Sequence, residues 1–404
     1  MLAAGTAAER GKRTLLIEKN EKLGKKLFIT GKGRCNITNA AEREEFFENI
    51  TRNPKFFYGA YSRFSNRDLM DLLEKMGLRM KVERGNRVFP ESDKSSDVIK
   101  ALAKYMSLNH VEVLLNTSVK ELLFEGLEAE KGPSKKISGV LLEDGRKILG
   151  DSVIVCTGGL SYPQTGSTGD GYRFGKAIGH TMVEPVPSLV PLLTAGSAAQ
   201  EMQGLSLKNV AVSVAIDGKK VFDDFGEMLF THFGLTGPVI LSASFYIVPQ
   251  LGKGKKIILS IDLKPALDED ALDKRLLKDF QKNTNKQFKN ALDELFPGKM
   301  IPVMVKLSGI SPEKPVNVIT KEERRKLVKL IKSLDFEIKG TRPVSEAIVT
   351  SGGINIKEVD PKSMGSKLVK GLFFAGEVLD LDAFTGGFNL QIAFSTGRMA
   401  GLNA

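Results

Sequence analysis

The chain has 404 residues and carries 59 lysine and arginine residues against 48 aspartate and glutamate residues, a formal net charge of +11. Its 42% apolar and 26% charged residues exclude a disordered or collagen-like chain, and its two cysteines and three histidines exclude a disulfide framework and a zinc site. No apolar run reaches the length of about 18 residues that a membrane span needs, and no signal peptide is recognisable, so we expect a reduced, cytoplasmic protein.

The first 160 residues alternate short β-rich runs with helical stretches, which predicts an α/β sheet. A helix of small residues at 2–8 precedes Thr14–Ile17, which we expect to be a buried parallel strand followed by Glu18. Asp144-Gly145 is typical of a hairpin turn. The other elements expected here are helices from Ser65 and Ser95 and strands at 112–115, 119–124, 139–142 and 153–156.

The pattern changes after about residue 190. Asp217-Gly218 separates two runs that predict an antiparallel hairpin, and Lys-rich helical sequence follows, in which Thr320 and Glu323 form a capping box. The α/β pattern returns near residue 341, with a buried strand at 372–375. We therefore predict an α/β domain interrupted by an insertion. The predicted segments are 1–190 (α/β, first part), 191–265 (inserted, β-rich), 266–340 (inserted, helical) and 341–404 (α/β, second part).

Glu18 is the first candidate functional residue. In dinucleotide-binding βαβ units, an acid about 20 residues beyond the glycine-rich turn hydrogen-bonds the adenosine ribose. Counting back from Glu18 puts that turn at or before Met1, so the first strand and the glycine-rich loop are missing from the sequence. We expect the coding sequence upstream of Met1 to encode them. The alternative for these residues is an ordinary helix followed by an ordinary strand.

Three glycine-containing segments indicate a bound anion or cofactor. In Gly31–Asn39, glycines let backbone amides approach an anion while Lys32 and Arg34 add charge; its alternative is a basic surface turn. Thr157-Gly158-Gly159 follows a strand and allows a second close backbone approach. Near the C-terminus, a strand runs into Gly376-Glu377, and a Gly-Gly turn then opens a helix whose N-terminal amides suit the electron-rich edge of a flavin.

With these motifs the sequence resembles the bacterial FAD-binding flavoproteins known as aminoacetone-oxidase-like, BaiN-like or YhiN-like proteins, which include rRNA dihydrouridine synthases. The resemblance covers essentially the whole chain. It implies a two-dinucleotide-binding-domain flavoprotein, with a Rossmann-like FAD domain in segments 1–190 and 341–404 and inserted β-rich and helical domains between them. The closest matches are Glu18–Lys26, Gly31–Asn39, Arg87–Pro90, Leu229–Pro238 and Ser351–Gly397.

The resemblance also implies the cofactor-binding residues. Glu18 would hold the adenosine ribose, and the Val119 backbone would meet the adenine. The residues implied to line the remainder of FAD are Lys26, Gly31, Gly33, Arg34, Cys35, Asn36, Thr157, Gly158, Gly159, Gly376, Glu377, Gly387, Asn389, Leu390 and Gln391.

The distribution of charge bears on the substrate. Residues 10–34 hold nine lysine and arginine residues against Glu18 and Glu21, and residues 252–340 hold 20 against 13 acids. Both surpluses exceed what two phosphates of FAD require, and contact with a polyanion would use them. The alternative is that these lysines only keep the protein soluble.

The leading hypothesis is an FAD-dependent oxidoreductase that reduces a uridine of 23S rRNA to dihydrouridine, with NAD(P)H as a transient reductant. Two residues are candidate catalytic groups: Cys35, as an acid activated by Arg34, and His232, as a substrate contact from the insertion. A small buried packing residue is the alternative for Cys35, a structural histidine is the alternative for His232, and Cys156 is expected in the core. The competing functions are a small-molecule flavin oxidase or ene-reductase, and a non-catalytic RNA-binding remnant.

Overall fold

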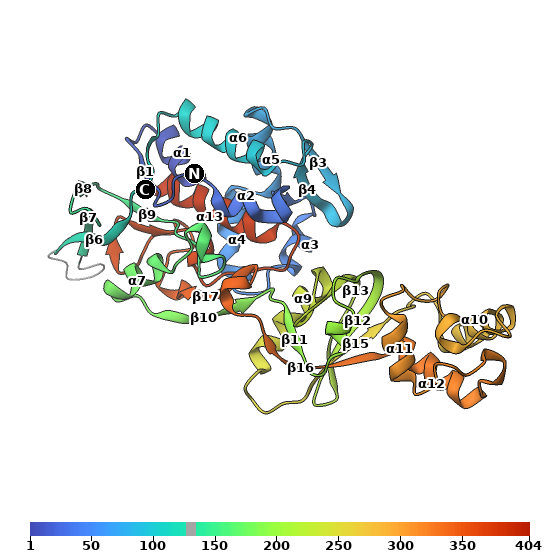
Figure 1. Cartoon of the computed structure of the whole chain (residues 1–404). Coiled ribbons are helices and arrows are strands. Elements are labelled where there is room, and N and C mark those ends of the chain that lie inside the picture. Colours follow the sequence, from blue (N-terminus) through green and yellow to red (C-terminus); the bar gives the residue numbers. More distant parts are fainter. Residues whose placement is uncertain (127–134) are drawn as a thin grey trace. The chain divides into compact units, whose positions relative to one another are not determined.

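A computed structural model describes residues 1–126 and 135–404 of the chain (Figure 1). The chain divides into two compact units. Unit 1 comprises residues 1–187 and 347–404, and unit 2 comprises residues 188–346. The four-segment domain division expected from the sequence stays a prediction.

Unit 1 mixes helices and strands. Its helices are α1 (Leu2–Glu9), α2 (Lys25–Ile29), α3 (Arg43–Glu48), α4 (Pro54–Arg63), α5 (Asn66–Lys75), α6 (Ser95–Leu108), α7 (Asp170–Ala177) and α13 (Phe388–Asn403). Its strands are β1 (Leu15–Ile17), β2 (Thr38–Asn39), β3 (Met80–Glu83), β4 (Arg87–Pro90), β5 (Glu112–Leu114), β6 (Val119–Gly126), β7 (Lys135–Leu142), β8 (Lys147–Leu149), β9 (Val153–Val155), β10 (Met182–Ser188), β17 (Val349–Ile354), β18 (Val369–Lys370) and β19 (Leu372–Phe374).

Two parallel strand pairs position the predicted site. β1 pairs with β5, and β9 pairs with β19. The two pairs are separate two-stranded sheets among the described residues. The carboxyl ends of parallel strands carry the ligand-binding loops of α/β folds. Glu18 after β1, Thr157 after β9 and Gly376 after β19 all lie at ends of this kind.

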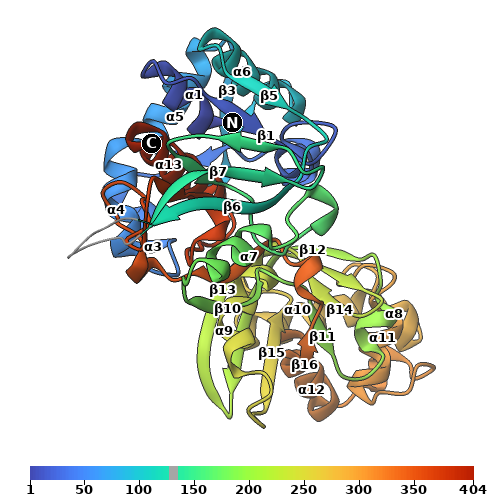
Figure 2. The same ribbon diagram turned by 90° about the vertical axis from the view of Figure 1, so that its left-hand side faces the viewer.

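Strand β7 is the centre of a further sheet in unit 1, in which β6 and β8 are antiparallel to it and β18 is parallel. The turn between β7 and β8 contains Asp144-Gly145, so the predicted hairpin is confirmed. β6 and β7 run side by side in Figure 2. A further sheet has the order β2-β4-β3. The loop that follows α2 lies beside this sheet.

Small residues allow the first and last helices to pack closely. α1 packs on α13, and a Cβ added to Gly401 would lie 2.4 Å from the carbonyl oxygen of Ala3. α1 also packs on α6, where Gly5 faces the ring of Tyr105. The small residues of α1 therefore allow close contacts with two other helices.

Unit 2 combines a closed β-barrel with helices. The barrel has the order β11-β14-β13-β12-β15-β16. Helices α10, α11 and α12 pack on one another beside it (Figure 1). The unit 2 elements are β11 (Leu192–Thr194), α8 (Ala198–Glu201), β12 (Ser206–Ile216), β13 (Lys219–Thr231), β14 (Gly234–Thr236), α9 (Pro238–Ile247), β15 (Ile257–Asp262), α10 (Glu269–Lys282), α11 (Ile301–Ser308), α12 (Lys321–Lys332) and β16 (Leu334–Thr341).

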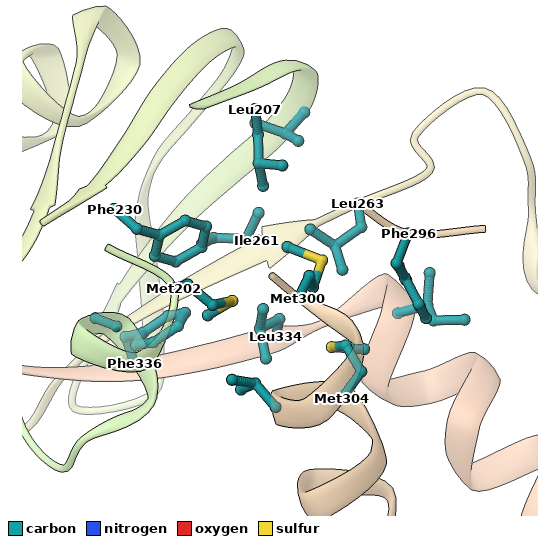
Figure 3. Packing of buried hydrophobic residues seen from close by; sticks show 14 of the residues in the cluster. Met202, Leu207, Phe230, Ile261, Leu263, Phe296, Met300, Met304, Leu334 and Phe336 are labelled. Carbon is teal, nitrogen blue, oxygen red and sulfur yellow. The ribbon is translucent and has the colours of Figure 1, made fainter. Parts of the chain in front are cut away.

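One hydrophobic cluster joins the barrel to these helices. Figure 3 shows Phe230 and Phe336 of the barrel near Met202, and Met300 and Met304 beyond them. All five residues are buried. Burial of apolar surface at roughly 25 cal/mol per Å² makes this cluster the main stabilising feature of unit 2.

Candidate cofactor site

The carboxylate of Glu18 stands at the carboxyl end of β1. Its Oε1 accepts hydrogen bonds from the backbone nitrogen and Nδ2 of Asn20, at 2.8 and 2.7 Å. Asn20 Nδ2 also donates to the carbonyl oxygen of Thr165, which ties β1 to the loop before α7. Oε2 has no hydrogen bond to any described residue, so it remains available to a ligand hydroxyl.

The centre of the site is a charged network between α2 and the end of β19. Lys26 Nζ lies 2.7 Å from Glu377 Oε2 and 2.5 Å from Ser161 Oγ. Glu377 Oε1 accepts hydrogen bonds from Ser161 Oγ and from the Thr350 nitrogen. Ser161 and Thr350 are fully buried. The network brings together Lys26 and Glu377, two predicted cofactor residues separated by 351 positions in the sequence.

The Thr157-Gly158-Gly159 turn packs against α7. Thr157 Oγ1 accepts a hydrogen bond from the Gly171 nitrogen, in the first turn of that helix. A Cβ on Gly159 would lie 2.5 Å from Thr350 Oγ1, so the residue must be glycine for the turn to approach the network. Tyr172 of α7 is buried here, and its hydroxyl has no partner among the described residues. Burial raises the pKa of Tyr172, and the nearby Glu377 carboxylate raises it further.

The loop after α2 has an unusual backbone. Gly31, Lys32 and Gly33 all have positive φ values, of 61°, 58° and 86°. Lys32 is exposed, whereas Asn36 presents a buried Oδ1 without a hydrogen-bond partner in the described part of the chain. An unpaired buried acceptor is costly unless a ligand or water satisfies it. The backbone of Gly31 and Gly33 and the Asn36 side chain therefore fit the predicted cofactor-binding role.

The structure corrects the roles predicted for Arg34 and Cys35. The Arg34 guanidinium pairs with Glu83 and Asp93, each at 2.5 Å, and stacks on the Phe89 ring. Its charge is therefore neutralised by acids of the same unit. Cys35 is fully buried in an apolar cluster, and burial raises the pKa of its thiol to about 12. The predicted activation of Cys35 by Arg34 is wrong, because the guanidinium is engaged elsewhere and the thiol packs in the core.

The start of α13 provides backbone donors. Gly387 precedes the helix with a φ of 101°, and no side chain caps it. The free amides of the first turn form an electropositive end. Asn389 uses its side chain to clasp Ala383 through hydrogen bonds of 2.9 and 2.7 Å. The Asn389 side chain is therefore engaged within the protein, and the neighbouring Leu390 is half-buried.

Gln391 differs from the prediction. It is fully buried, its Oε1 accepts a hydrogen bond from Thr38 Oγ1, and its Nε2 donates to Ser395 Oγ. The side chain therefore fixes α13 to β2 instead of facing the flavin ring. The sequence pattern around Leu390 does not predict these hydrogen bonds of Gln391, because Thr38 comes from a distant part of the sequence.

Three other predicted residues lie outside the central network. The Val119 carbonyl at the start of β6 accepts a hydrogen bond from the Arg173 guanidinium. His232 is exposed in unit 2, on the turn between β13 and β14, with its ring against Phe233. Cys156, expected in the core, follows the end of β9 and is exposed; the prediction for Cys156 is wrong because the strand ends one residue earlier.

Sequence reasoning missed the residues that organise the network, Ser161, Thr350 and Tyr172. Each is a common residue type in an unremarkable local sequence. Only the tertiary fold brings them to Glu377. The described residues contain no group of three or more histidine, cysteine, aspartate or glutamate side chains suited to a metal, and no described helix is long and apolar enough to cross a membrane.

Comparison with known proteins identifies the family. The HI0933-like protein Rossmann domain matches residues 1–403. The chain belongs to this family. A 3-dehydro-bile acid delta(4,6)-reductase from Clostridium scindens is 30% identical over 99% of the chain and 95% of its own length. Ribosomal RNA dihydrouridine synthases from Haemophilus influenzae and Escherichia coli are each 28% identical, covering 100% and 98% of the chain and 95% and 93% of their own lengths.

A solved structure supports the fold. The chain resembles 3-ketosteroid delta1-dehydrogenase from Sterolibacterium denitrificans, with a TM-score of 0.51 and 13% identity over 99% of the chain and 96% of that protein. The predicted family resemblance and the Rossmann-type flavoprotein fold are thus confirmed.

The residues present fit FAD. The start of α13 supplies free amides for negative charge, and Asn36 supplies an unsatisfied buried acceptor beside the positive-φ glycines Gly31 and Gly33. The protein is an FAD-dependent oxidoreductase of the HI0933-like family. Membership favours an enzyme over the non-catalytic RNA-binding alternative.

Proposed function

We propose that this protein reduces the C5=C6 bond of a uridine in 23S rRNA to dihydrouridine. In the balanced reaction, uridine, NAD(P)H and a proton give dihydrouridine and NAD(P)⁺. Bound FAD would supply the hydride-transfer chemistry. An rRNA substrate also implies a cytoplasmic location.

The observation that supports an RNA substrate is the group of exposed lysine and arginine side chains on helix α12 of unit 2, which form no ion pair with any described residue. Two full-length relatives named ribosomal RNA dihydrouridine synthase support the same substrate. Neutralising phosphates is the dominant source of affinity for nucleic acids, so a polyanionic substrate has a physical use for this charge.

The residues of the site have separable roles in this proposal. Lys26, held by Glu377 and Ser161, binds and orients the polar chain of the cofactor. The first-turn amides of α13 stabilise negative charge on the ring. His232 contacts the substrate, since it is exposed and projects from a turn of the inserted unit. Cys35 takes no part in proton transfer, because its thiol is buried.

Deletion of the gene tests the proposal. Nucleosides from purified 23S rRNA would be analysed by liquid chromatography and mass spectrometry in wild-type, deletion and complemented strains. We expect one dihydrouridine to disappear on deletion and return on complementation. An unchanged dihydrouridine content in 23S rRNA would refute the substrate assignment.

One relative favours a second candidate function, the reduction of a conjugated C=C bond in a small molecule, because the bile acid reductase is 30% identical over nearly its full length. The purified full-length protein would be incubated with NADH or NADPH and a steroid enone. Turnover of the enone together with unchanged rRNA dihydrouridine would establish this second candidate.

A further inference from the structure

Helix α12 carries a concentrated and unpaired positive charge. Its sequence has six basic residues against Glu322 and Glu323. Four of the six are exposed and form no ion pair with any residue that the structure describes. We call them the α12 basic face: Lys321, Arg325, Lys326 and Lys329.

The fold directs this face outward. Leu327, Val328 and Ile331 are buried in the core of unit 2, which fixes the rotation of the helix about its axis. The capping box of Thr320 and Glu323 fixes its start. The exposed arc of α12 is therefore set by packing, and the basic residues occupy it together with Glu322 as the single acid on the same side.

The two remaining basic residues of α12 have acidic partners. Arg324 makes two hydrogen bonds to Asp273, and Lys332 lies 2.5 Å from Asp262. Elsewhere in unit 2, exposed lysines such as Lys253, Lys274 and Lys286 form no ion pair with any described residue, whereas others are paired. Among the pairs are Lys220 with Asp223, Lys282 with Glu294, Lys289 with Glu313 and Lys306 with Glu201.

Part of the charge pattern on α12 opposes the helix's own stability, although Glu322 and Glu323 in the first turn and Lys329 and Lys332 in the last turn favour it. Lys321, Arg325 and Lys329 follow one another at spacings of four residues, and like charges at that spacing destabilise a helix by about 0.2–0.5 kcal/mol per pair. Lys321 also places a positive charge in the first turn, against the helix dipole. Local choices that work against the fold are typical of functional surfaces.

We propose that the α12 basic face binds the phosphate backbone of RNA. With a rise of 1.5 Å per residue, Lys321, Arg325 and Lys329 extend over roughly 12 Å along one side of the helix. A row of mobile cations suits a continuous polyanion, and no base-reading geometry is needed. The inference rests on the proposed function, because it assigns the RNA a docking surface in unit 2.

Two matched variants of the full-length protein test this inference. The first is K321Q/R325Q/K326Q/K329Q, which removes the α12 basic face. The control is K220Q/K282Q/K289Q/K306Q, which removes the same number of charges from paired, exposed lysines of the same unit. Binding of a fluorescein-labelled polyuridine of about 20 nucleotides, longer than common single-strand site sizes, would be followed by fluorescence anisotropy over a range of salt concentrations.

We expect the face variant to bind at least tenfold more weakly at low salt. The slope of log affinity against log salt should fall by about 0.7 for each lost contact, whereas the control variant should change little. A charge-retaining variant, K321R/R325K/K326R/K329R, should keep wild-type affinity and slope. Melting temperatures near that of the wild type would show that all three variants fold.

Two outcomes would overturn the inference. Equal weakening of the face and control variants would show that only net charge matters. Wild-type RNA binding by the face variant would place the RNA contact elsewhere, with any loss of association with intact ribosomes then reporting a protein partner. Neither outcome bears on the dihydrouridine content of the deletion strain, so failure of this inference and failure of the proposed function are distinguishable.

Discussion

The two basic segments of the chain have a similar appearance in the sequence, but parts of them have different settings in the structure. Within residues 10–34, four of the nine basic side chains form ion pairs in unit 1. Those pairs are Lys19 with Asp170, Lys25 with Glu21, Lys26 with Glu377, and Arg34 with Glu83 and Asp93. On α12, four basic side chains have no partner among the described residues. A surplus of charge can thus build a site in one place and present a surface in another.

The largest expected effect tests how closely the start of α13 packs against β2 in unit 1. Gly387 has a φ of 101°, and an added Cβ would lie 2.3 Å from the carbonyl oxygen of Thr38. We expect Gly387→Ala to lower the free energy of unfolding by about 4 kcal/mol, through backbone strain and a clash that cannot relax. Urea unfolding followed by circular dichroism measures it, since the chain has no tryptophan.

The control for this variant is Gly33→Ala. Gly33 also has a positive φ, but an added Cβ would meet nothing within 4 Å. It should cost only the strain of the left-handed conformation, about 1 kcal/mol. Similar losses in the two variants would contradict the idea that α13 begins in close contact with β2.

The second expected effect compares a largely buried ion pair of unit 1 with a more exposed ion pair of the same unit. Lys26→Met leaves Glu377 largely buried without its cation, and we expect a loss of about 3 kcal/mol in the free energy of unfolding. Lys25→Met, which breaks a more exposed pair with Glu21, should cost under about 1 kcal/mol.

A double variant sharpens this test. Lys26→Met combined with Glu377→Gln should recover part of the loss, because no uncompensated charge then remains buried. Additive losses would show that the ion pair is not the source of the effect. Flavin absorbance of the purified variants would report separately on cofactor binding.

A smaller effect concerns pH. His180 is buried, with Nδ1 3.1 Å from Glu358 Oε2 and Nε2 2.8 Å from Ser366 Oγ. Burial lowers the pKa of His180 below its usual 6.5, although Glu358 partly opposes this. Since the unfolded chain then binds the proton more readily, the contribution of neutral His180 to stability is present above pH 6.5 and is lost as the pH falls below it.

We therefore expect the free energy of unfolding of the wild type to fall more steeply between pH 6.5 and pH 5 than that of His180→Gln. Equal slopes for the wild type and His180→Gln would show that His180 does not titrate differently in the folded state.

The smallest expected effect concerns the α12 basic face of unit 2. Replacing Lys321 and Arg325 by glutamine should change the free energy of unfolding by less than about 0.5 kcal/mol, and a slight gain is expected because repulsion between like charges is relieved. A loss above about 1 kcal/mol in urea unfolding would show that these side chains stabilise unit 2 and are not free for a partner.

Local patterns predicted much of the fold. Ser65 and Thr320 cap helices as expected, because a capping box involves residues only three positions apart. The hairpin at Asp217-Gly218 is confirmed for the same reason. Closure of the barrel was not predicted, since pairing of β11 with β16 joins strands separated by most of the insertion.

The site was predicted less completely than the fold. Lys26 and Glu377 are brought together in the structure, but nothing in the sequence near Arg34 indicates that Glu83 and Asp93 neutralise it. A charged side chain in a glycine-rich loop looks the same whether it faces a ligand or a distant acid. The local sequence does not show that Cys35 is buried, and Cys35 was for that reason predicted to be a reactive thiol.

The contact between α1 and α13 has a consequence for biosynthesis. The N-terminal helix packs on a helix that is translated after all of unit 2. Unit 2 is continuous in the sequence, so it can fold while it emerges from the ribosome, whereas unit 1 must wait for residues 388–403. Until then the side of α1 that faces α13 has no partner, although α6 already covers another side. Nascent chains stalled within α12 should therefore be more sensitive to protease in residues 1–187 than in the barrel.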